Sequence, residues 1–437
     1  MQLSNNLDMV SHLIMICTGG VDRSREVSSM QGMLDGIRVI DFTTTVAGPF
    51  CGFYLCEMGA EVIHLERPGI GDMARLYPPY FKGISGTFVQ MNHGKKSVTM
   101  DLKNPRGLEL FKELVAVSDV LVSNFSGGTM DRMGVGYEVL SKINPRLVMC
   151  EMSGYGQTGP LSQYPAYDGI IQAMTGIMAT TGEEHPTRVG VLVGDIGTAM
   201  AGTIAILGSL YAREKTGMGE YIDLAMYDTL LTFLEAKFLE YSILGKDTVR
   251  TGNRYPHLAP FDSFSTKDKD VVICAANEST FGALCKAMGK PELAKDERFN
   301  NPLARLARHE ELKGMIEEWT KQHTRDEVVE ILMAHGTPVA PAKEVSEAIS
   351  HPHTAARGMI VELEQLSPET GQMEKLKIYP IPIKTRNHVV KSYPHAPALG
   401  EHNDWMLTEV LGKSAEEAEE VKASGAMGPV SASVTQG

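Results

Sequence analysis

The sequence predicts an α/β protein built on a doubly wound parallel sheet, and three observations lead to this fold class. Short β-branched apolar runs alternate with helical segments from Gly36 onward, which is the pattern of β-α-β units. The chain has 437 residues, enough for about two or three domains and a large core. Hydrophobic residues make up 43% and charged residues 22%, which is the balance of a globular protein rather than a disordered or fibrous one.

The first β-α-β unit spans residues 36–68. GIRVIDF (36–42) predicts a strand, FCGFYLCEMG (50–59) a helix and AEVIHLERP (60–68) a second strand. Because parallel neighbours need a crossover helix between them, repetition of this pattern predicts one continued parallel sheet. The pattern is repeated by a helix at 104–118, a strand at 119–125, a helix at 137–144 and a strand at 146–152.

The second half of the chain contains a long helical region and then a compositional break. GTAMAGTIAILGSLYAREK (197–215) predicts a small-residue helix, and TLLTFLEAKFLEYSIL (229–244) predicts another after an intervening strand. Gly, Pro, Asn and Asp crowd residues 245–262, which indicates a loop. A second unit begins at VVICAAN (271–277), and a T-x-x-E capping box at 324–327 predicts the start of one of its helices.

Charge and cysteine content exclude several classes of protein. Lys and Arg total 41 against 54 for Asp and Glu, a formal net charge of −13, so generic binding to nucleic acid or to an anionic membrane is not expected. No run approaches the roughly 18 apolar residues of a membrane span, and no Lys or Arg precedes the short apolar stretch near the N-terminus as a signal peptide requires. The six cysteines are scattered, without metal-ligand spacing, which favours a reducing, cytoplasmic setting and predicts no metal site.

A dinucleotide-like motif, GYGQTG at 154–159, follows the predicted strand at 146–152. Pro160 comes directly after it, so no helix N-terminus begins where a pyrophosphate would bind. A lone motif of this kind is weak support for a nicotinamide cofactor. It is interpreted as a Gly-rich loop at the carboxyl edge of a strand, and a nicotinamide-dependent oxidoreductase stays an alternative.

Basic residues follow several strands of the predicted sheet. Arg67 ends one strand, Lys95, Lys96 and Lys103 lie within GKKSVTMDLKN, and Arg132 follows another strand. Each alone is interpreted as a solvated surface cation. Because the carboxyl ends of parallel strands share one edge of a sheet, Arg67 and Arg132 can converge there. The set therefore predicts a crevice that holds a phosphorylated ligand.

Two aspartates are candidates for chemistry. Asp195 lies between Gly194 and the small-residue helix, and Asp168 begins the segment DGIIQAMTG. Either carboxylate can cap a helix N-terminus, and either can act as a covalent nucleophile. The residues alone do not rank these interpretations. Three histidines without ligand-like spacing are interpreted as structural groups: His64, His93 and His257.

A series of segments carries a more specific signal than any single motif. They are GIRVIDFTTTVAGPF, GAEVIHLERPGIGD, NHGKKSVTMDLKNPRG, NFSGGTMDRMGVGYEVLSKINPRLV, SGYGQTGP, PAYDGIIQAMTG, VGDIGTAMAG and GNRYPHLAPFD. Together they resemble the class III CoA-transferases, the CaiB/BaiF family, between Leu34 and Leu411. The resemblance implies a large Rossmann-like α/β domain with a parallel sheet, a smaller middle α+β domain, and two chains interlocked in a homodimer.

On this resemblance the large domain is discontinuous in sequence. Residues 34–245 form its first part, residues 252–340 the small domain and residues 341–412 the return segment. Residues 1–33 show no sustained periodicity and are predicted to be a loosely ordered extension. Residues 413–437 are predicted to be a flexible acidic tail.

The resemblance also implies the site residues. Asp195 matches the family's nucleophile, which ranks it above Asp168. We expect its carboxylate to be ionised at neutral pH and backbone N–H groups near Gly194 to stabilise oxyanions. Ser126 departs from the Arg of many members, and RYPHLAPFDSF stands where formyl-CoA transferases have a Gly-rich loop. The residues implied to bind CoA are Val46, Ala47, Arg67, Met100, Asp101, Leu102, Lys103, Asn124, Phe125, Arg132, Ala166, Tyr167 and Asp168.

Among the branches of the family, the segments look most like the transferases that use acetyl-CoA and oxalate. This implies acetyl-CoA as donor and oxalate as acceptor, with CoA passing through aspartyl anhydride and aspartyl-CoA intermediates. Because the thioester energy is conserved, we expect acyl-CoA and a small carboxylate as substrates, and no metal, ATP or permanently bound cofactor. The alternatives are a formyl-CoA or succinyl-CoA dependent transferase acting on another dicarboxylate, a 2-methylacyl-CoA racemase, and a CoA-binding protein without catalysis.

Overall fold

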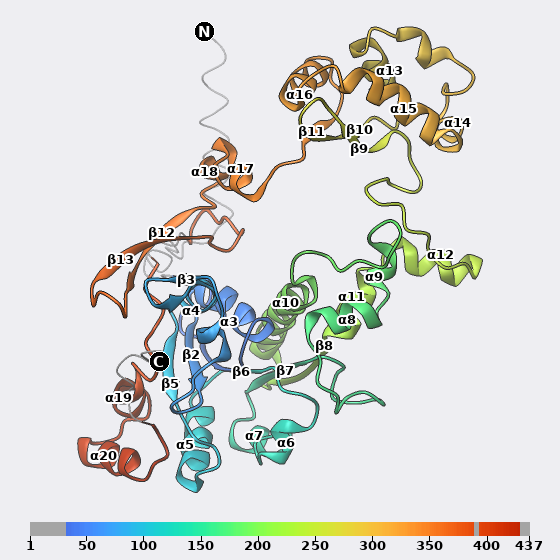
Figure 1. Cartoon of the computed structure of the whole chain (residues 1–437). Helices are drawn as coiled ribbons and strands as arrows, with labels where there is room; N and C mark the ends of the chain where they lie inside the picture. Colours follow the sequence, from blue (N-terminus) through green and yellow to red (C-terminus); the bar gives the residue numbers. More distant parts are fainter. Residues whose placement is uncertain (1–31, 389–392, 429–437) are drawn as a thin grey trace, which may run out of the picture. The chain divides into compact units, whose positions relative to one another are not determined.

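The computed structural model describes residues 32–388 and 393–428 (Figure 1). The predicted extension therefore lies outside the described residues except for its last two positions. The described chain forms two compact units. Unit 1 takes the residues up to Tyr164, Thr198–Leu224 and the residues from Val361 onward, and unit 2 takes Pro165–Gly197 and Ala225–Ile360.

Unit 1 is built on a six-stranded sheet. Its strands are β1 (Arg38–Phe42), β2 (Glu61–Glu66), β5 (Lys96–Thr99), β6 (Val120–Ser123), β7 (Val148–Ser153) and β8 (Glu220–Ala225). The strand order is β5-β2-β1-β6-β7-β8, and β1 pairs in parallel with both β2 and β6, as β2 does with β5 and β6 with β7. The predicted α/β class with a parallel sheet is confirmed. The order reverses between β1 and β6, and ligands bind at the carboxyl ends of such a pair.

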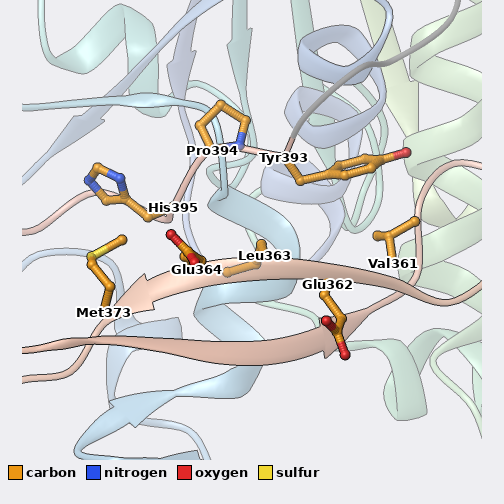
Figure 2. Close-up of a pocket in the computed structure, with 8 residues that line it drawn as sticks. All are labelled: Val361, Glu362, Leu363, Glu364, Met373, Tyr393, Pro394 and His395. Atoms are coloured by element: carbon orange, nitrogen blue, oxygen red, sulfur yellow. The ribbon is translucent and has the colours of Figure 1, made fainter.

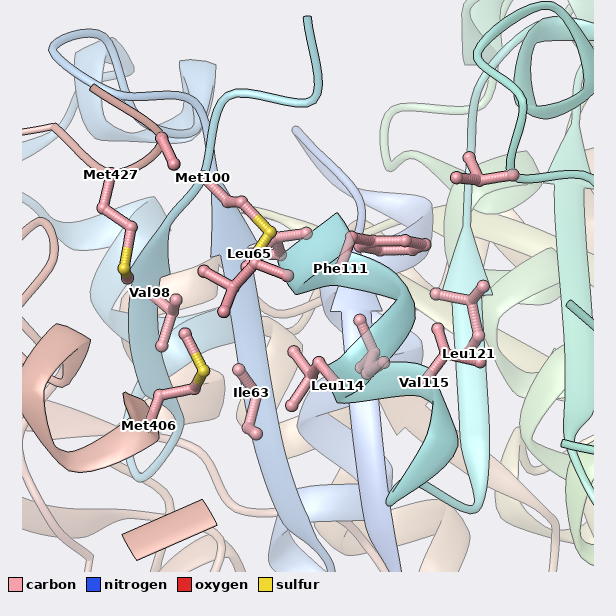
Figure 3. Close-up of a cluster of buried hydrophobic side chains, with 14 of the residues drawn as sticks. Ile63, Leu65, Val98, Met100, Phe111, Leu114, Val115, Leu121, Met406 and Met427 are labelled. Carbon is pink, nitrogen blue, oxygen red and sulfur yellow. The ribbon is translucent and has the colours of Figure 1, made fainter. Parts of the chain in front are cut away.

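Helix α5 (Pro105–Ala116) shows how unit 1 forms its core. The side chain of Asn104 accepts the N–H of Arg106, and Pro105 occupies the first turn, where no N–H is needed. The apolar stripe of α5 then packs on the sheet (Figure 3). Residues of this cluster drawn there are Ile63, Leu65, Val98, Met100, Phe111, Leu114, Val115, Leu121, Met406 and Met427.

The other elements of unit 1 are mostly short. They are α3 (Ala47–Glu57), η1 (Met73–Leu76), β3 (Tyr80–Phe81), β4 (Ile84–Ser85), α4 (Gly86–Asn92), α6 (Thr129–Arg132), α7 (Tyr137–Ile143), β12 (Val361–Leu366), β13 (Met373–Ile378), α19 (Asn403–Trp405), the π-helical turn η3 (Met406–Val410) and α20 (Ala415–Ala423).

The C-terminal segment belongs to the core of unit 1. Ala418 and Val421 of α20 are buried, and Met427 beyond it joins the same cluster. The flexible tail predicted for residues 413–437 is therefore wrong as far as residue 428, where the described residues end. The acidic composition that suggested disorder is the solvent face of an amphipathic helix.

Unit 2 contains a three-stranded sheet with helices packed on it. β10 (Asp270–Cys274) pairs antiparallel with β9 (Phe261–Ser265) and β11 (Val339–Pro341). The predicted capping box is present, with Thr324 and Glu327 bonded to each other's backbone at the start of α16 (Arg325–Ala334). The remaining helices are α8 (Asp168–Met174), α9 (Ile177–Thr180), α11 (Met226–Thr232), α12 (Ala236–Leu244), α13 (Glu278–Ala287), η2 (Pro291–Lys295), α14 (Pro302–Ala307), α15 (His309–Thr320), α17 (Val345–Ile349) and α18 (Pro352–Ala356).

The division into units differs from the predicted boundaries of 245, 252 and 340. Unit 2 includes Pro165–Gly197 as well as the residues from Ala225 onward, and glycines explain why these two segments join. A Cβ at Gly194 would lie 3.0 Å from the sulfur of Met226, and one at Gly197 would lie 2.7 Å from the ring of Phe233. The side chains of Met226 and Phe233 thus pack closely on the backbone at Gly194 and Gly197, a long-range contact that no local pattern reveals.

Helix α10 (Val193–Thr216) is continuous, although its first turn belongs to unit 2 and the rest to unit 1. It starts earlier than the predicted residue 197. Its 24 residues and hydropathy of 1.4 make it the one helix of the described chain that is long and apolar enough to cross a membrane. Buried helices of soluble proteins share this composition, and Ile206 and Leu210 of α10 are buried.

Candidate active site

The carboxyl ends of β1 and β6 are joined by side-chain bonds to one turn. The backbone N–H of Thr44 donates to Oδ1 of Asn124 over 3.0 Å, and Nδ2 of Asn124 donates to the Thr44 carbonyl over 2.7 Å. Thr45 has φ of 76°, a left-handed conformation that costs a non-glycine residue about 1 kcal/mol or more. The contacts of the Thr44-Thr45 turn must therefore offset this cost.

Asp72 holds the same turn from the other side. Its Oδ1 accepts from the Thr44 hydroxyl over 2.7 Å, from the Thr45 N–H over 2.8 Å and from the Ala74 N–H over 2.9 Å. One buried carboxylate thus fixes the turn after β1 and caps the short helix η1. Asp72 was not singled out in the sequence, although its position after two glycines in GIGD at 69–72 marks a turn.

The unit 1 residues predicted to bind CoA all follow the carboxyl ends of neighbouring strands, so the structure brings them to one edge of the sheet. Arg67, Lys103 and Arg132 are exposed, whereas the Met100 side chain is 3% exposed within the core, which leaves only its backbone for a ligand. Val46 and Ala47 follow β1, Arg67 follows β2, Met100, Asp101, Leu102 and Lys103 follow β5, Asn124 and Phe125 follow β6, and Arg132 ends α6.

The Gly-rich loop at 154–159 lies at this edge too. Its Gln157 accepts the N–H of Gly128 over 2.9 Å and donates its own N–H to Asp223 over 3.0 Å. No helix starts at Pro160, and the next one, α8, begins only at Asp168. The geometry of a pyrophosphate-binding helix N-terminus is therefore missing after this motif.

In unit 2, Asp168 caps the start of the helix that carries Asp195. Its Oδ1 accepts the Gly194 N–H over 2.6 Å and lies 3.4 Å from the Asp195 nitrogen. Gln172, one turn later on α8, donates to the other oxygen of Asp168 over 2.6 Å and accepts the Val189 N–H over 2.9 Å. These bonds hold the backbone at two positions before Asp195, at Val189 and at Gly194.

These bonds correct two expectations. Asp195 is not the cap of the helix, because it lies within the first turn of α10, and the capping carboxylate is Asp168. The Gly194 N–H is bonded to Asp168 and is not free to stabilise an oxyanion. Sequence reasoning missed this because the two aspartates are far apart in the chain and each precedes an apolar run of its own.

The protonation of Asp195 also differs from the expectation. Burial, and after it the charge of Asp168, raises the pKa of Asp195 to about 7, so part of the carboxyl groups are protonated at neutral pH. A like charge and desolvation have this combined effect on carboxylates at many functional sites. The Asp195 carboxyl group is therefore not fully ionised at pH 7.

The predicted residues fall into two groups that belong to different units. Ala166, Tyr167, Asp168 and Asp195 are in unit 2, and the other predicted residues are in unit 1. Tyr167 is 73% exposed and Asp168 is 3% exposed, so of these neighbours the tyrosine is open to a ligand and the aspartate is a buried positioning group. No group of three or more potential metal ligands occurs in the described part of the chain.

A pocket of about 640 Å³ lies elsewhere on unit 1, over the β12–β13 hairpin (Figure 2). Figure 2 shows Glu362 and Glu364 among its lining residues, with Tyr393, Pro394 and His395 above the hairpin. None of the predicted site residues lines it. Its two carboxylates would repel the phosphates of CoA, so it is not the candidate site.

Unit 1 contains a parallel sheet whose strand order reverses between β1 and β6, and unit 2 holds the half-buried Asp195 beside the buried Asp168. The family model for CoA-transferase family III matches residues 34–403. The chain belongs to CoA-transferase family III, and it is a CoA-transferase that uses CoA thioesters as substrates.

Known proteins similar to this chain include enzymes with several substrate pairs. An acetyl-CoA:oxalate CoA-transferase of Acetobacter aceti is 44% identical over 334 residues, covering 76% of this chain and 86% of that protein. A succinyl-CoA:mesaconate CoA-transferase of Haloarcula marismortui is 36% identical, covering 86% and 96%. The crystal structure of a CaiB/BaiF family protein from Brucella suis matches with a TM-score of 0.78 at 35% identity, covering 87% of this chain and 100% of that one.

Proposed function

We propose that this enzyme transfers CoA from acetyl-CoA to oxalate through intermediates on Asp195. The observation that carries the substrate pair is the 44% identity to an acetyl-CoA:oxalate CoA-transferase, compared with 36% or 37% to relatives named for succinyl-CoA with mesaconate or citramalate. The observation that supports Asp195 is its place on the first turn of α10, with a carboxyl pKa raised to about 7 and a backbone held by Asp168.

The first half-reaction loads CoA onto the enzyme. The ionised Asp195 carboxylate attacks the thioester carbonyl of acetyl-CoA, the C–S bond breaks, and CoA leaves as a thiolate. The product is a mixed anhydride of acetate and Asp195. The thiolate then attacks the aspartyl carbonyl of this anhydride, which forms an aspartyl-CoA thioester and releases acetate.

The second half-reaction passes CoA to the acceptor. A carboxylate oxygen of oxalate attacks the aspartyl-CoA carbonyl and expels the thiolate, giving a mixed anhydride of oxalate and Asp195. The thiolate attacks the oxalyl carbonyl, so that oxalyl-CoA forms and the Asp195 carboxylate is regenerated. Over the whole cycle, one thioester is broken and one is made. Each step exchanges a C–S bond of a thioester for a C–O bond of an anhydride, or the reverse.

Asp168 and Gln172 act in this scheme as positioning residues. The bonds from Asp168 to the start of α10 orient the Asp195 carboxyl group, and the bond from Gln172 keeps the Asp168 carboxylate in place. The negative charge of Asp168 also makes the Asp195 carboxylate more basic. A more basic carboxylate is the better nucleophile once it is ionised.

We also propose that CoA binds at the carboxyl edge of the unit 1 sheet. Arg67, Lys103 and Arg132 supply exposed cations there in a chain with a net charge of −13, and phosphates need such a local basic cluster. Substitution of Arg67 by Ala should raise the KM for acetyl-CoA and leave the KM for oxalate nearly unchanged.

We also propose that the protein is a homodimer in a reducing cytoplasm and that it binds neither membrane nor nucleic acid. Helix α12 supports the dimer, because none of its residues is buried and its Phe238, Leu239, Tyr241 and Ile243 are 55%, 56%, 60% and 74% exposed. Apolar faces of this kind mark association sites. Cys51, Cys56, Cys150, Cys274 and Cys285 are free thiols, which supports the reducing compartment.

The test is an exchange assay that combines three donors with a panel of acceptors. Acetyl-CoA, formyl-CoA and succinyl-CoA are each offered with oxalate, mesaconate, citramalate and glutarate, and the new thioester is identified by mass spectrometry. We expect the highest kcat/KM for acetyl-CoA with oxalate. Failure to form oxalyl-CoA from any donor would contradict the acceptor, and label release from an α-carbon without CoA exchange would indicate a racemase.

The chemical role of Asp195 is tested separately by trapping. After incubation with acetyl-CoA, hydroxylamine should convert the aspartyl thioester to a hydroxamate on the peptide that contains Asp195. Asp228 in the first turn of α11 gives a matched control, because it is an exposed aspartate at a comparable helix position. Asp228→Asn should keep both trapping and turnover, whereas Asp195→Asn should lose both and still bind CoA.

A further inference from the structure

A fully buried set of charged side chains lies beneath the Thr44-Thr45 turn of unit 1. Asp41 on β1, His64 on β2 and Lys95 before β5 have side chains that are 0% exposed. His64 bridges two carboxylates, with Nδ1 at 3.4 Å from Oδ2 of Asp41 and Nε2 at 3.4 Å from Oδ2 of Asp72. Neither ring nitrogen makes a well-formed hydrogen bond, so these contacts act through charge.

The charges in this cluster require a cation at position 64. The other charged groups around His64 are Lys95 on Asp41 at 2.6 Å and Arg75 on Glu66 at 2.7 Å. With Asp72, three carboxylates thus face two permanent cations. Only a protonated His64 makes the buried cluster neutral, and an uncompensated buried charge is strongly unfavourable.

Within the cluster, Asp72 is the carboxylate whose negative charge is balanced by His64 alone. Asp41 has Lys95, and Glu66 has Arg75 together with the Ser97 hydroxyl at 2.6 Å. Asp72 has no Lys or Arg partner among the described residues, and its other oxygen carries the bonds to Thr44 and Thr45. His64 therefore affects the Thr44-Thr45 turn only through the Asp72 carboxylate.

We propose that His64 is a positioning residue for acyl-CoA: as an imidazolium it keeps Asp72 ionised, and ionised Asp72 fixes the turn after β1 that leads into the predicted CoA contacts Val46 and Ala47. This inference rests on the proposed CoA site. Loss of the charge at position 64 leaves Asp72 as a buried carboxylate without a cation, an unfavourable arrangement that is relieved when the carboxylate moves away from the turn towards water. The left-handed Thr45 loses its support, and CoA affinity falls.

The pH dependence that follows is specific. Burial by itself would lower the pKa of His64, but Asp41 and then Asp72 and Glu66 raise it to about 9. The other groups that face it are Asp41, Asp72 and Glu66, whose pKa values are all lowered, and these stay ionised as the pH rises. The Kd for CoA should therefore be constant around neutral pH and increase as the pH passes through about 9.

The experiment compares two substitutions that differ in charge. His64→Gln removes the cation, and His64→Lys replaces it with one that does not titrate in this range. We expect His64→Gln to raise the KM for acetyl-CoA and the calorimetric Kd for CoA about tenfold at pH 7, with little change in kcat. His64→Lys should keep values near those of the wild type and remove the increase at high pH.

His93→Gln is the matched control, because His93 is also a buried histidine on a carboxylate, with Nε2 at 3.1 Å from Glu57. It should change stability without changing the pH profile of CoA binding. If His64→Gln lowers the melting temperature as His93→Gln does but leaves the Kd unchanged, His64 is only a structural residue.

The wild-type Kd profile tests the proposal even where the glutamine variant does not fold. A Kd that stays constant from about pH 7 to about pH 10 overturns it, since the charge of His64 changes in this range. If the wild type binds no CoA at any pH, the proposed CoA site itself is wrong, an outcome distinct from a pH-independent Kd.

Discussion

Asp195 shows the opposition between stability and reactivity within a single side chain. Its carboxylate is partly buried beside Asp168, and the pKa is raised to about 7. The protonated form is thus favoured in the folded state, whereas a nucleophile has to be ionised. Burial that makes the carboxylate reactive also makes its ionised form unfavourable for the fold.

Asp195→Asn should stabilise the protein at alkaline pH while it abolishes transfer. Since the folded-state pKa lies above the unfolded value of 3.8, the wild type loses stability as the pH rises between these two values, and the amide does not. The gain should be on the order of a few kcal/mol at pH 8. Denaturant unfolding of both proteins measures it, and a gain of equal size at pH 4 would show that ionisation of Asp195 is not its cause.

Asp168→Asn should move the acidic limb of the kcat/KM profile to lower pH. Removal of the neighbouring negative charge lowers the pKa of Asp195, but only in part, because burial is the larger cause. An amide oxygen at position 168 can still accept the Gly194 N–H, although the amide NH2 group can no longer accept from Gln172. A pH-rate profile checks this, and an unshifted limb with reduced kcat would show that Asp168 acts through geometry alone.

The sequence predicted the candidate site only in part at this scale. Asp195 and Asp168 were both singled out, because an aspartate beside a glycine at the start of an apolar run indicates either a helix cap or a reactive carboxylate. The bond from the Gly194 N–H to Asp168 could not be predicted, because it joins backbone and side chain 26 residues apart. His64 was interpreted as structural, since its partners Asp41 and Asp72 meet it only after β1 and β2 pair.

At the scale of elements, strands were predicted well where both faces are buried. β6 and β7 are buried at every position and are mostly apolar, which is typical of strands in a parallel sheet. The predicted helix at 229–244 is interrupted instead, because Glu235 takes φ of 49° between α11 and α12. Nothing in the periodicity of TLLTFLEAKFLEYSIL marks that break.

Truncation after Gly412 should destabilise unit 1, although the removed segment is acidic and small. The deletion exposes the core that Ala418, Val421 and Met427 cover, and loss of several buried apolar side chains costs several kcal/mol. The midpoint of urea unfolding measures the effect. The full chain is the reference, and an equal midpoint for the truncated chain would mean that α20 does not support the core.

At the scale of the whole molecule, the exposed apolar side chains of α12 support the proposed homodimer. Ile243→Lys on α12 should dissociate the proposed homodimer, since the side chain is 74% exposed in the single chain and a charge there would be buried in the dimer. Sedimentation velocity measures the mass. Lys246→Glu, a few residues further on and also exposed, is the matched control, and a monomeric wild type would contradict the proposal.

The arrangement of the whole chain was the least predictable level. Local patterns gave the order of the elements, but unit 2 takes residues from two separate stretches, which meet through long-range contacts such as those at Gly194 and Gly197. Family resemblance supplied the idea of a discontinuous domain, and it placed the boundaries at other residues. Long-range packing between small residues leaves no periodic trace in a sequence.

Because α10 is continuous, the direction of the Asp195 side chain depends on the number of residues between it and the buried part of the helix. An α-helix advances about 1.5 Å and turns about 100° with each residue, so the direction of the Asp195 side chain is set by how many residues separate it from the anchored Ile206 and Leu210. A single inserted residue between them would turn Gly194 and Asp195 by about 100° relative to Ile206 and Leu210. The number of residues between Asp195 and Ile206 is therefore more constrained than the identity of the side chains in between.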